Sequence, residues 1–409
     1  MTRYLIIGNS AAGLSAARAI RTKDTRGKIT LLSDEPYPYY SRLALTYLIA
    51  GKIQKETLFT GVKDLYRKLG LTSKLRTRVD RISPDTDEVV TSSGRRFVFD
   101  RLLLATGASP TAMPIPGSTL PGVCALRSLR DAEKICRRVG VGRHAVILGG
   151  GLVGLQTAQA LCYRGMRVTL VVSSDRILSR NLDRTGSDLI ARAVGRSGIT
   201  VLLNSQAVEF SRGRRTPLSV VLENGNPLQA HLVVLAKSVT PNIGLAAKSA
   251  LSVHDGIVVN ETLQTSREQV FAAGDVAEFQ ERVNFIWPNA IEQGRLAGLN
   301  MAGENASYQA GIGMNVTELF GIKIASIGKT EPEQGEEEIC RLDAERAVYR
   351  KVILNEGRMT GALLVGDITD CGILHRLIRN RNHVAAYLTK LMTHSAGLAN
   401  AFYAGSEPR

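Results

Sequence analysis

Short apolar runs that end in glycine-rich turns recur along the chain and predict its main elements. One apolar run over 4–7 precedes a glycine-rich turn over 8–13, and another over 145–148 precedes a turn over 149–154. The pattern after each turn is that of a helix. Because a strand, a tight glycine turn and a helix begin a βαβ unit, both stretches are predicted to start a nucleotide-binding fold.

The two turns differ in their glycines. The second has Gly149, Gly151 and Gly154 at all three fingerprint positions, whereas the first has Ser10 between Gly8 and Gly13. Such glycines let the backbone turn tightly and let a pyrophosphate approach a helix N-terminus. The pair predicts two dinucleotide sites, although an ordinary strand-to-helix turn is an equal alternative for the first copy.

Other predicted strands end in residues suited to a nucleotide. A strand over 28–32 ends before Asp34 and Glu35, and either carboxylate can accept a hydrogen bond from a ribose 2′-hydroxyl or be a surface turn residue. Another strand ends in Gly274 and Asp275, where the aspartate can accept hydrogen bonds from a polyol such as a ribityl chain. A β-turn is the alternative for that pair.

Composition bounds the class of protein. The chain has 409 residues, of which 44% are hydrophobic and 22% charged, as in a globular protein of two or three domains. No apolar run reaches the roughly 18 residues that span a bilayer, and no signal peptide is evident, so a cytoplasmic location is expected. The five cysteines are scattered without a CxxC pair, which predicts neither a disulfide framework nor a metal or iron-sulfur site.

The net charge of +15 is high, but its distribution does not favour a nucleic-acid partner. Arginines are spread along the chain, with modest clusters at Arg212, Arg214 and Arg215 and over 375–381. No nucleic-acid module accompanies them. A solvated basic surface and a site for an acidic protein both remain open.

Together these motifs resemble the pyridine nucleotide-disulfide oxidoreductase superfamily, in particular its flavoprotein NAD(P)H oxidoreductases akin to nitrite, ferredoxin and rubredoxin reductase subunits. The resemblance covers nearly the whole chain and rests on segments in this order: Gly8–Gly13, Pro38–Arg42, Ala105–Gly107, Gly149–Gly154, Pro241-Asn242, Phe271–Asp275 and Ala290–Gly294. It implies an α/β fold with two Rossmann-like domains and a C-terminal α+β interface domain. The implied FAD domain spans 1–113 and 242–309, the NAD(P) domain 114–241, and the interface domain of a homodimer 310–409.

The resemblance also implies the residues that bind each cofactor. Those implied for FAD are Gly8, Ser10, Ala11, Ala12, Gly13, Asp34, Glu35, Arg42, Val79, Ala105, Thr106, Gly107, Gly274, Asp275, Ala290 and Ile291. Those implied for NAD(P)H are Gly149, Gly151, Leu152, Val153, Gly154, Ser173 and Arg176. A helix that starts near Ala290 would direct its N-terminus at the flavin pyrimidine edge, where the dipole stabilises negative charge.

Three departures from the family pattern narrow the chemistry. Leu43 stands where single-cysteine members have their cysteine, and none of the first 123 residues is a cysteine. Because a thiolate is essential to that chemistry, disulfide reductase, coenzyme A disulfide reductase and peroxidase roles are excluded. Tyr47 and Gln156 replace the lysine and glutamate that ferredoxin reductase relatives carry near the flavin. Loss of both charges predicts a neutral nicotinamide pocket with these two as the catalytic candidates, while core packing is an equal alternative for Tyr47.

The third departure concerns the choice of nicotinamide. Val172 stands where an acid would bind the ribose 2′-hydroxyl. Arg176 or Arg180 could meet a 2′-phosphate, and Asp175 could replace the missing acid, so NADH and NADPH both remain open.

The resemblance implies an enzyme that passes a hydride from NAD(P)H to FAD and electrons onward to an acceptor. Since the chain has no iron-sulfur ligands, a separate acidic ferredoxin or rubredoxin is the expected acceptor. One alternative is an NADH oxidase that forms hydrogen peroxide. Another is a flavin-bearing subunit of a larger complex, whose nicotinamide site has weakened.

Overall fold

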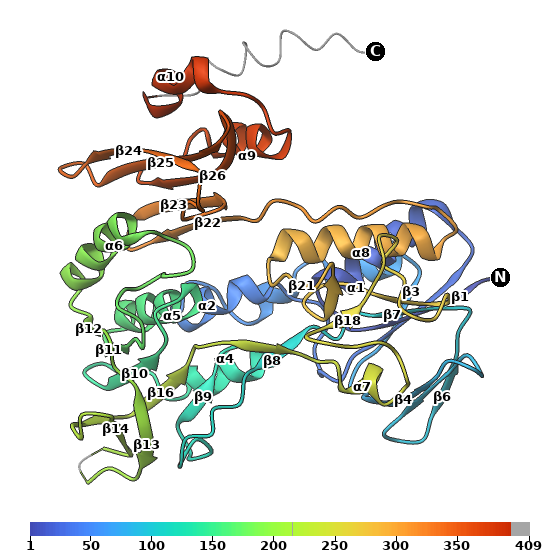
Figure 1. Cartoon of the computed structure of the whole chain (residues 1–409). Coiled ribbons are helices and arrows are strands. Elements are labelled where there is room, and N and C mark those ends of the chain that lie inside the picture. The colour runs from blue at the N-terminus through green and yellow to red at the C-terminus, as the bar shows by residue number, and fades with distance from the viewer. Residues whose placement is uncertain (215, 394–409) are drawn as a thin grey trace. The chain divides into compact units, whose positions relative to one another are not determined.

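The computed structural model describes residues 1–214 and 216–393 (Figure 1). Arg215 of the predicted basic cluster lies outside the described residues. The chain forms two compact units, the first made of Met1–Leu48, Lys52–Thr111 and Ser238–Ala310. The second contains Ile49–Gly51, Ala112–Lys237 and the described chain from Gly311 onward. The second unit therefore joins the segments predicted as NAD(P) and interface domains, and the division into three domains stays a prediction.

A parallel five-stranded sheet with strand order β19-β7-β1-β2-β3 forms the centre of the first unit. Its strands are β1 (Arg3–Ile7), β2 (Lys28–Leu32), β3 (Leu71–Lys74), β7 (Arg101–Leu104) and β19 (Val270–Ala272). In both β1 and β2 the first residue is exposed and the next four are buried. Parallel strands that are covered on both faces require such continuous apolar runs, which is why these strands were visible in the sequence.

Smaller elements complete the first unit. The helical ones are α1 (Ala11–Lys23), η1 (Arg42–Ala44), α2 (Leu45–Ile49), η2 (Glu56–Phe59), α3 (Val62–Lys68), α7 (Gly244–Ala247) and α8 (Trp287–Met301). The remaining strands form one antiparallel sheet of β4 (Val79–Ser83), β5 (Glu88–Thr91) and β6 (Arg96–Val98), a pair of β8 (Ala108–Pro110) and β17 (Val239–Pro241), and a small sheet of β18 (Ile257–Val258), β20 (Ala277–Phe279) and β21 (Arg282–Val283).

Helices α1 and α8 pack closely because two glycines of α8 face the backbone of α1. A Cβ atom on Gly294 would lie 2.2 Å from the carbonyl oxygen of Ala12, and one on Gly298 would lie 2.4 Å from that of Ala16. Helix α8 begins at Trp287, three residues before the predicted start near Ala290. The proline in its first turn accounts for the difference. In a sequence, proline usually indicates the end of a helix, but it is well tolerated in the first turn.

The second unit holds a second parallel sheet, with strand order β12-β11-β10-β16-β9. Its strands are β9 (Val123–Ala125), β10 (His144–Leu148), β11 (Arg167–Val171), β12 (Thr200–Leu202) and β16 (Leu232–Leu235), and its helices are α4 (Leu129–Cys136), α5 (Leu152–Tyr163) and α6 (Arg184–Arg196). An antiparallel sheet of β13 (Ala207–Ser211), β14 (Leu218–Leu222) and β15 (Pro227–Ala230) precedes β16.

An antiparallel sheet with helices forms the C-terminal part of this unit. Its strand order is β22-β23-β26-β25-β24, and the elements are β22 (Met314–Leu319), β23 (Ile322–Gly328), β24 (Glu337–Asp343), β25 (Val348–Asn355), β26 (Arg358–Val365), α9 (Cys371–Arg379), η3 (Ala385–Tyr387) and α10 (Leu388–Thr393). Two parallel nucleotide-binding sheets followed by an α+β segment confirm the predicted fold class. None of the described helices combines the length and apolar character needed to cross a membrane.

Candidate functional site

Three strand ends of the first sheet meet at one edge. Strands β1, β7 and β19 are parallel neighbours in which Ile7, Leu104 and Ala272 lie level with one another. The segments that follow them are therefore brought together from distant parts of the sequence. A Cβ atom on Gly8, whose φ is +123°, would lie 2.0 Å from the carbonyl oxygen of Ala105. Ligands of open α/β sheets bind at this carboxyl edge.

The first glycine turn presents the start of α1 to this edge. A Cβ atom on Gly13 would lie 2.0 Å from the carbonyl oxygen of Gly8, so the turn closes on the helix. Ser10 is the N-cap residue, and its side chain makes no capping hydrogen bond. Ala11 and Ala12 follow and are buried. The N–H groups of the first helical turn can therefore bind an anionic ligand.

Gly274 packs against the same helix. Its φ is +83°, and a Cβ atom there would lie 3.0 Å from the Cβ of Ala12. Its N–H group donates a hydrogen bond to the side-chain oxygen of Gln293 on α8 at 2.8 Å. Gln293 was not among the predicted site residues. It could have been noticed as a polar residue among the apolar positions of the helix face that is buried. Asp275 follows Gly274 and is half-buried.

The two candidate acids after β2 differ in their contacts and exposure, and Glu35 is the one that is held by neighbouring side chains. Its carboxylate accepts hydrogen bonds from the guanidinium of Arg42 at 2.8 Å and from the hydroxyl of Tyr40 at 2.6 Å. Asp34 is exposed. Predicted residues Glu35 and Arg42 are thus held side by side, whereas Val79 lies on β4, where it pairs with Thr91.

A hydroxyl that sequence reasoning missed links two segments of the candidate FAD site. The hydroxyl of Tyr66 donates to the side-chain oxygen of Asn9 at 2.8 Å and accepts from the N–H of Tyr39 at 2.8 Å. Burial raises the pKa of Tyr66, so the hydroxyl stays protonated and able to donate. Asn9 belongs to the first glycine turn, and Tyr39 precedes Arg42. The contact therefore fixes the turn relative to the arginine segment.

The Ala105-Thr106-Gly107 segment is tied to the returning chain. The side-chain amide of Asn242 donates to the carbonyl oxygen of Thr106 at 2.8 Å, and its N–H donates to that of Gly107 at 2.9 Å. The hydroxyl of Thr106 donates to the carbonyl oxygen of Asn242 at 3.2 Å. These contacts give the Pro241-Asn242 motif a structural role where the chain re-enters the first unit.

The first turn of α8 holds an unsatisfied donor. The side-chain nitrogen of Asn289 is buried and has no hydrogen-bond partner within the described part of the chain. The N-cap residue Ile286 cannot cap the helix through its side chain. Of the predicted residues, Ala290 is buried and Ile291 is 41% exposed. A buried donor without an acceptor is costly, so an acceptor-bearing ligand such as a flavin ring fits this position.

The second glycine turn repeats the geometry of the first. A Cβ atom on Gly149, whose φ is +128°, would lie 2.3 Å from the carbonyl oxygen of Ala236, and one on Gly154 would lie 2.1 Å from that of Gly149. Gly151 is exposed, with no atom within 4 Å of a built Cβ. Leu152 is half-buried and Val153 is 45% exposed at the start of α5. This turn also leaves the helix N-terminus open to a pyrophosphate.

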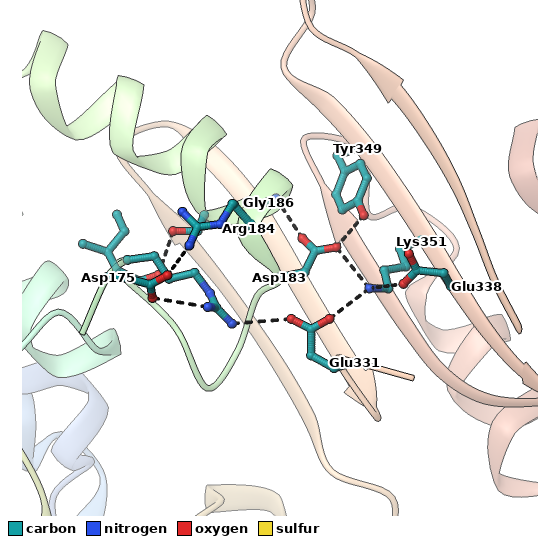
Figure 2. Close-up of polar contacts among 11 residues, drawn as sticks. Asp175, Asp183, Arg184, Gly186, Glu331, Glu338, Tyr349 and Lys351 are labelled. Carbon is teal, nitrogen blue, oxygen red and sulfur yellow. Dashed lines mark hydrogen bonds and ion pairs between the residues drawn. The ribbon is translucent and has the colours of Figure 1, made fainter. Parts of the chain in front are cut away.

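The loop after β11 departs from a simple ribose site. Val172 is buried beneath the glycine turn, where its methyl groups lie 2.9 Å from a built Cβ of Gly150. Ser173 is exposed. The guanidinium of Arg176 is held by the carboxylates of Asp175 at 3.3 Å and Glu331 at 3.4 Å (Figure 2). The predicted residues of this loop therefore include one cation that is already paired.

The two catalytic candidates lie in different units. Tyr47, in the first unit, is 55% exposed, which does not support the alternative that it is core packing. Gln156, in the second, is half-buried on α5 and donates from its side-chain amide to the hydroxyl of Thr317 on β22 at 3.2 Å. Gln156 thus contacts the C-terminal sheet.

All five cysteines are free thiols, and burial raises the pKa of Cys124 to about 11. Among the described residues, no group of three or more histidine, cysteine, aspartate or glutamate side chains is placed to hold a metal ion.

Comparison with known proteins identifies the class. Residues 2–294 match the pyridine nucleotide-disulphide oxidoreductase family, and residues 314–382 match the rubredoxin NAD+ reductase C-terminal domain. The chain belongs to the pyridine nucleotide-disulphide oxidoreductase family. FAD and NAD(P)H are the cofactors of this family and are those that the sequence predicted. The two glycine turns, over 8–13 and 149–154, which we call the glycine cradles, and the unsatisfied Asn289 donor of α8 fit these cofactors.

Individual relatives extend over nearly the whole chain. It is 31% identical over 404 residues to the NADH-dependent phenylglyoxylate dehydrogenase subunit epsilon of Aromatoleum evansii, covering 96% of this chain and 95% of that one. It is 29% identical to the NADH-rubredoxin oxidoreductase of Clostridium acetobutylicum, covering 90% and 92%. The crystal structure of the covalent putidaredoxin reductase-putidaredoxin complex matches with a TM-score of 0.89 at 27% identity, covering 98% of each chain. The chain spans about half the length of some other relatives.

Proposed function

We propose that this chain passes a hydride from NAD(P)H to FAD and electrons on to a separate iron-sulfur protein of the ferredoxin or rubredoxin type. The observation that carries the proposal is the pair of glycine cradles with the same geometry, one in each unit. The first is completed by Glu35 after β2 and Asp275 after β19, at the carboxyl edge of the same sheet, as a long dinucleotide requires. The match of residues 314–382 to a rubredoxin reductase domain supports the acceptor class.

The residues of the first unit would hold FAD along its length. The N-terminus of α1 would bind the pyrophosphate, Glu35 a ribose hydroxyl, and Asp275 the ribityl hydroxyls. The α8 N-terminus would face the flavin pyrimidine edge, where its dipole and the Asn289 amide favour negative charge. Bound FAD supplies the chemistry of accepting a hydride and releasing electrons one at a time.

The second unit would position the nicotinamide coenzyme. The N-terminus of α5, with Leu152 and Val153, would hold its pyrophosphate, and Ser173 and Arg176 lie in the loop that follows β11. Tyr47 in the first unit and Gln156 in the second are proposed to act on the nicotinamide, each from its own unit, in place of the lysine and glutamate of ferredoxin reductase relatives. Neither residue is a lysine or a carboxylic acid, so we assign to each a role in orienting the nicotinamide ring and excluding water.

An anaerobic titration tests the hydride step. NADH or NADPH should bleach the flavin absorbance of the purified holoprotein, and reoxidation by an added ferredoxin or rubredoxin should follow. If neither coenzyme bleached the flavin, the oxidoreductase proposal would be wrong. If air alone reoxidised it rapidly to give hydrogen peroxide, with no gain from an iron-sulfur acceptor, the oxidase alternative would replace it.

The acceptor would dock by charge. With a net charge of +15, the chain would attract an acidic carrier, and the basic surface is defined as His375, Arg376, Arg379 and Arg381. The three arginines are exposed on or just after α9. Arg379→Gln and Arg381→Gln should each lower the rate of acceptor reduction at low salt, and Arg26→Gln, an exposed arginine elsewhere, should not. A rate that did not depend on ionic strength would remove the docking proposal.

A second arrangement is favoured by one relative. The phenylglyoxylate dehydrogenase subunit epsilon is a component of a larger enzyme, and the same role here would make the acceptor another subunit. Size measurement of the protein isolated from its native source would distinguish a free homodimer from such an assembly. We also propose a cytoplasmic location, because scattered free thiols are typical of reducing compartments.

A further inference from the structure

A chain of ion pairs connects the loop after β11 to the C-terminal sheet within the second unit (Figure 2). The guanidinium of Arg176 lies between the carboxylates of Asp175 and Glu331, at 3.3 and 3.4 Å. We call these two carboxylates the clamp. The second oxygen of Asp175 also pairs with Arg184 at the start of α6. The Arg176 side chain is 22% exposed, so the clamp surrounds much of its charged group.

Glu331 is held in turn by a buried cation. Its second carboxylate oxygen lies 3.3 Å from the ammonium of Lys351, which is 2% exposed. That ammonium also contacts Asp183 at 3.3 Å and Glu338 at 2.6 Å. Burial opposes the charge of Lys351, but the hydrogen bond to Glu338 and the charge of Asp183 outweigh it and raise its pKa. Lys351 therefore stays charged and keeps Glu331 directed at Arg176.

Asp183 fixes the other side of the same loop. It caps α6 by accepting from the N–H of Gly186 at 2.9 Å, and it accepts from the hydroxyl of Tyr349 at 2.5 Å. Tyr349 and Lys351 both lie on β25. The C-terminal segment therefore contacts the loop over 172–183 at two points. Glu331 contacts it at Arg176, and Tyr349 and Lys351 contact it at Asp183.

The clamp changes what this loop offers to a coenzyme. A 2′-phosphate requires an arginine whose N–H groups are available in a fork. Here the two terminal nitrogens of Arg176 already face carboxylates, and its Nε is buried without a partner in the described part of the chain. The two carboxylates of the clamp balance the charges of Arg176 and Arg184, so this pair of arginines offers a doubly charged phosphate no net positive charge. Arg180, the other arginine that the sequence offered for a 2′-phosphate, is exposed in the same loop and lies outside the clamp. A neutral 2′-hydroxyl meets no such obstacle.

We propose that Glu331, together with Asp175, sets the coenzyme preference toward NADH by withholding Arg176 from a 2′-phosphate. The selecting carboxylate thus comes from the C-terminal segment instead of from the end of β11, where Val172 stands. This inference rests on the proposed function, because it assumes that the loop after β11 receives the adenosine end of a nicotinamide coenzyme.

Binding of adenosine nucleotides tests the inference without the redox reaction. We would measure dissociation constants of 5′-AMP and of adenosine 2′,5′-bisphosphate for the FAD-loaded protein by calorimetry. The wild type should prefer 5′-AMP. Glu331→Gln should tighten binding of the bisphosphate about tenfold, the effect of one charge-assisted hydrogen bond, and leave 5′-AMP unchanged. The gain should disappear in the double variant with Arg176→Gln.

Glu333→Gln is the matched control. Glu333 lies two residues away, is 74% exposed and pairs with Lys329 at 2.7 Å, so the same change of charge occurs outside the clamp. It should leave both dissociation constants unchanged. If Glu331→Gln fails to fold, Asp175→Asn removes the other clamp carboxylate and should act in the same direction. The ratio of kcat/KM for NADPH to that for NADH should rise in parallel.

Three results would overturn the inference. They are a wild type that prefers the bisphosphate, an unchanged preference in Glu331→Gln, and an equal gain in Glu333→Gln or in the Arg176→Gln background. Failure of the proposed function looks different, because neither NADH nor NADPH would then bleach the flavin, whereas the nucleotide titrations would still report on the clamp.

Discussion

Replacing Gly294 by alanine should disrupt the contact between α1 and α8. The new Cβ would lie 2.2 Å from the carbonyl oxygen of Ala12 and 2.7 Å from its Cα, and both are backbone atoms that cannot rotate away. A normal carbon–oxygen contact needs more than 3 Å, so the helices must separate by about 1 Å or bend. Overpacking of this kind typically costs about 1–3 kcal/mol, and the rigid backbone on both sides favours the upper end.

The consequence should reach the candidate FAD site, because α1 presents the glycine turn and α8 presents Asn289. We expect Gly294→Ala to lower the midpoint of thermal unfolding by several degrees, at about 2–4 °C per kcal/mol for a domain of this size, and to weaken FAD retention. The assay is thermal unfolding with and without FAD, together with release of flavin on dilution.

Gly195→Ala supplies the control within the same chain. Gly195 lies in α6, and a Cβ there would have no atom within 4 Å. Alanine at that position should be neutral or should stabilise by up to about 1 kcal/mol, since it reduces the freedom of the unfolded chain. If Gly294→Ala unfolded at the same temperature as wild type and kept its flavin, the argument from close backbone packing would be refuted.

Three further predictions concern other parts of the molecule. Burial lowers the pKa of His144 below its ordinary 6.5, so the unfolded chain binds more protons than the folded chain. The stability that this difference contributes is present above pH 6.5 and should be lost as the pH falls below it. His144→Gln should flatten this pH dependence of the unfolding free energy, measured by urea titration. Gly8→Ala should abolish flavin absorbance, whereas Gly149→Ala should keep it and lose bleaching by NADH, with circular dichroism to verify folding. Arg350→Met should cost about 3–5 kcal/mol by removing the guanidinium that pairs with the buried Asp370 carboxylate, and the second change Asp370→Leu should recover much of it; equal stability of both variants in denaturant would contradict this.

The predictable part of the site depends on backbone geometry. Strands β1 and β10 appear as apolar runs because they are buried on both faces. The first and last positions of both turns require glycine, because a Cβ atom there would collide with a backbone carbonyl oxygen. The first and last glycines of each turn therefore leave a local signal. The structure then shows why the strand ends at Ala105 and Gly274 belong with Gly8, since their strands are neighbours in one sheet.

The clamp left no local signal. Arg176 and Glu331 are 155 residues apart, and nothing in the period or composition of either segment indicates the other. The same holds for Thr106 and Asn242, which are 136 residues apart, although the asparagine at least belonged to a recognisable motif. Ion pairs and hydrogen bonds between distant segments follow from tertiary placement, which one sequence does not specify residue by residue.

The degenerate first fingerprint can now be explained in physical terms. Ser10 and Gly151 occupy the same position as N-cap residues, with φ of −135° and −83° in extended backbone that any residue can adopt. By contrast, Gly8 and Gly149, the first glycine of each turn, have φ of +123° and +128°, and a Cβ on either would collide with a backbone carbonyl. The middle position is therefore constrained by how closely a ligand approaches and not by the turn itself. Serine there leaves the cradle intact, which is why a pattern that weights all three glycines equally underrates the first site.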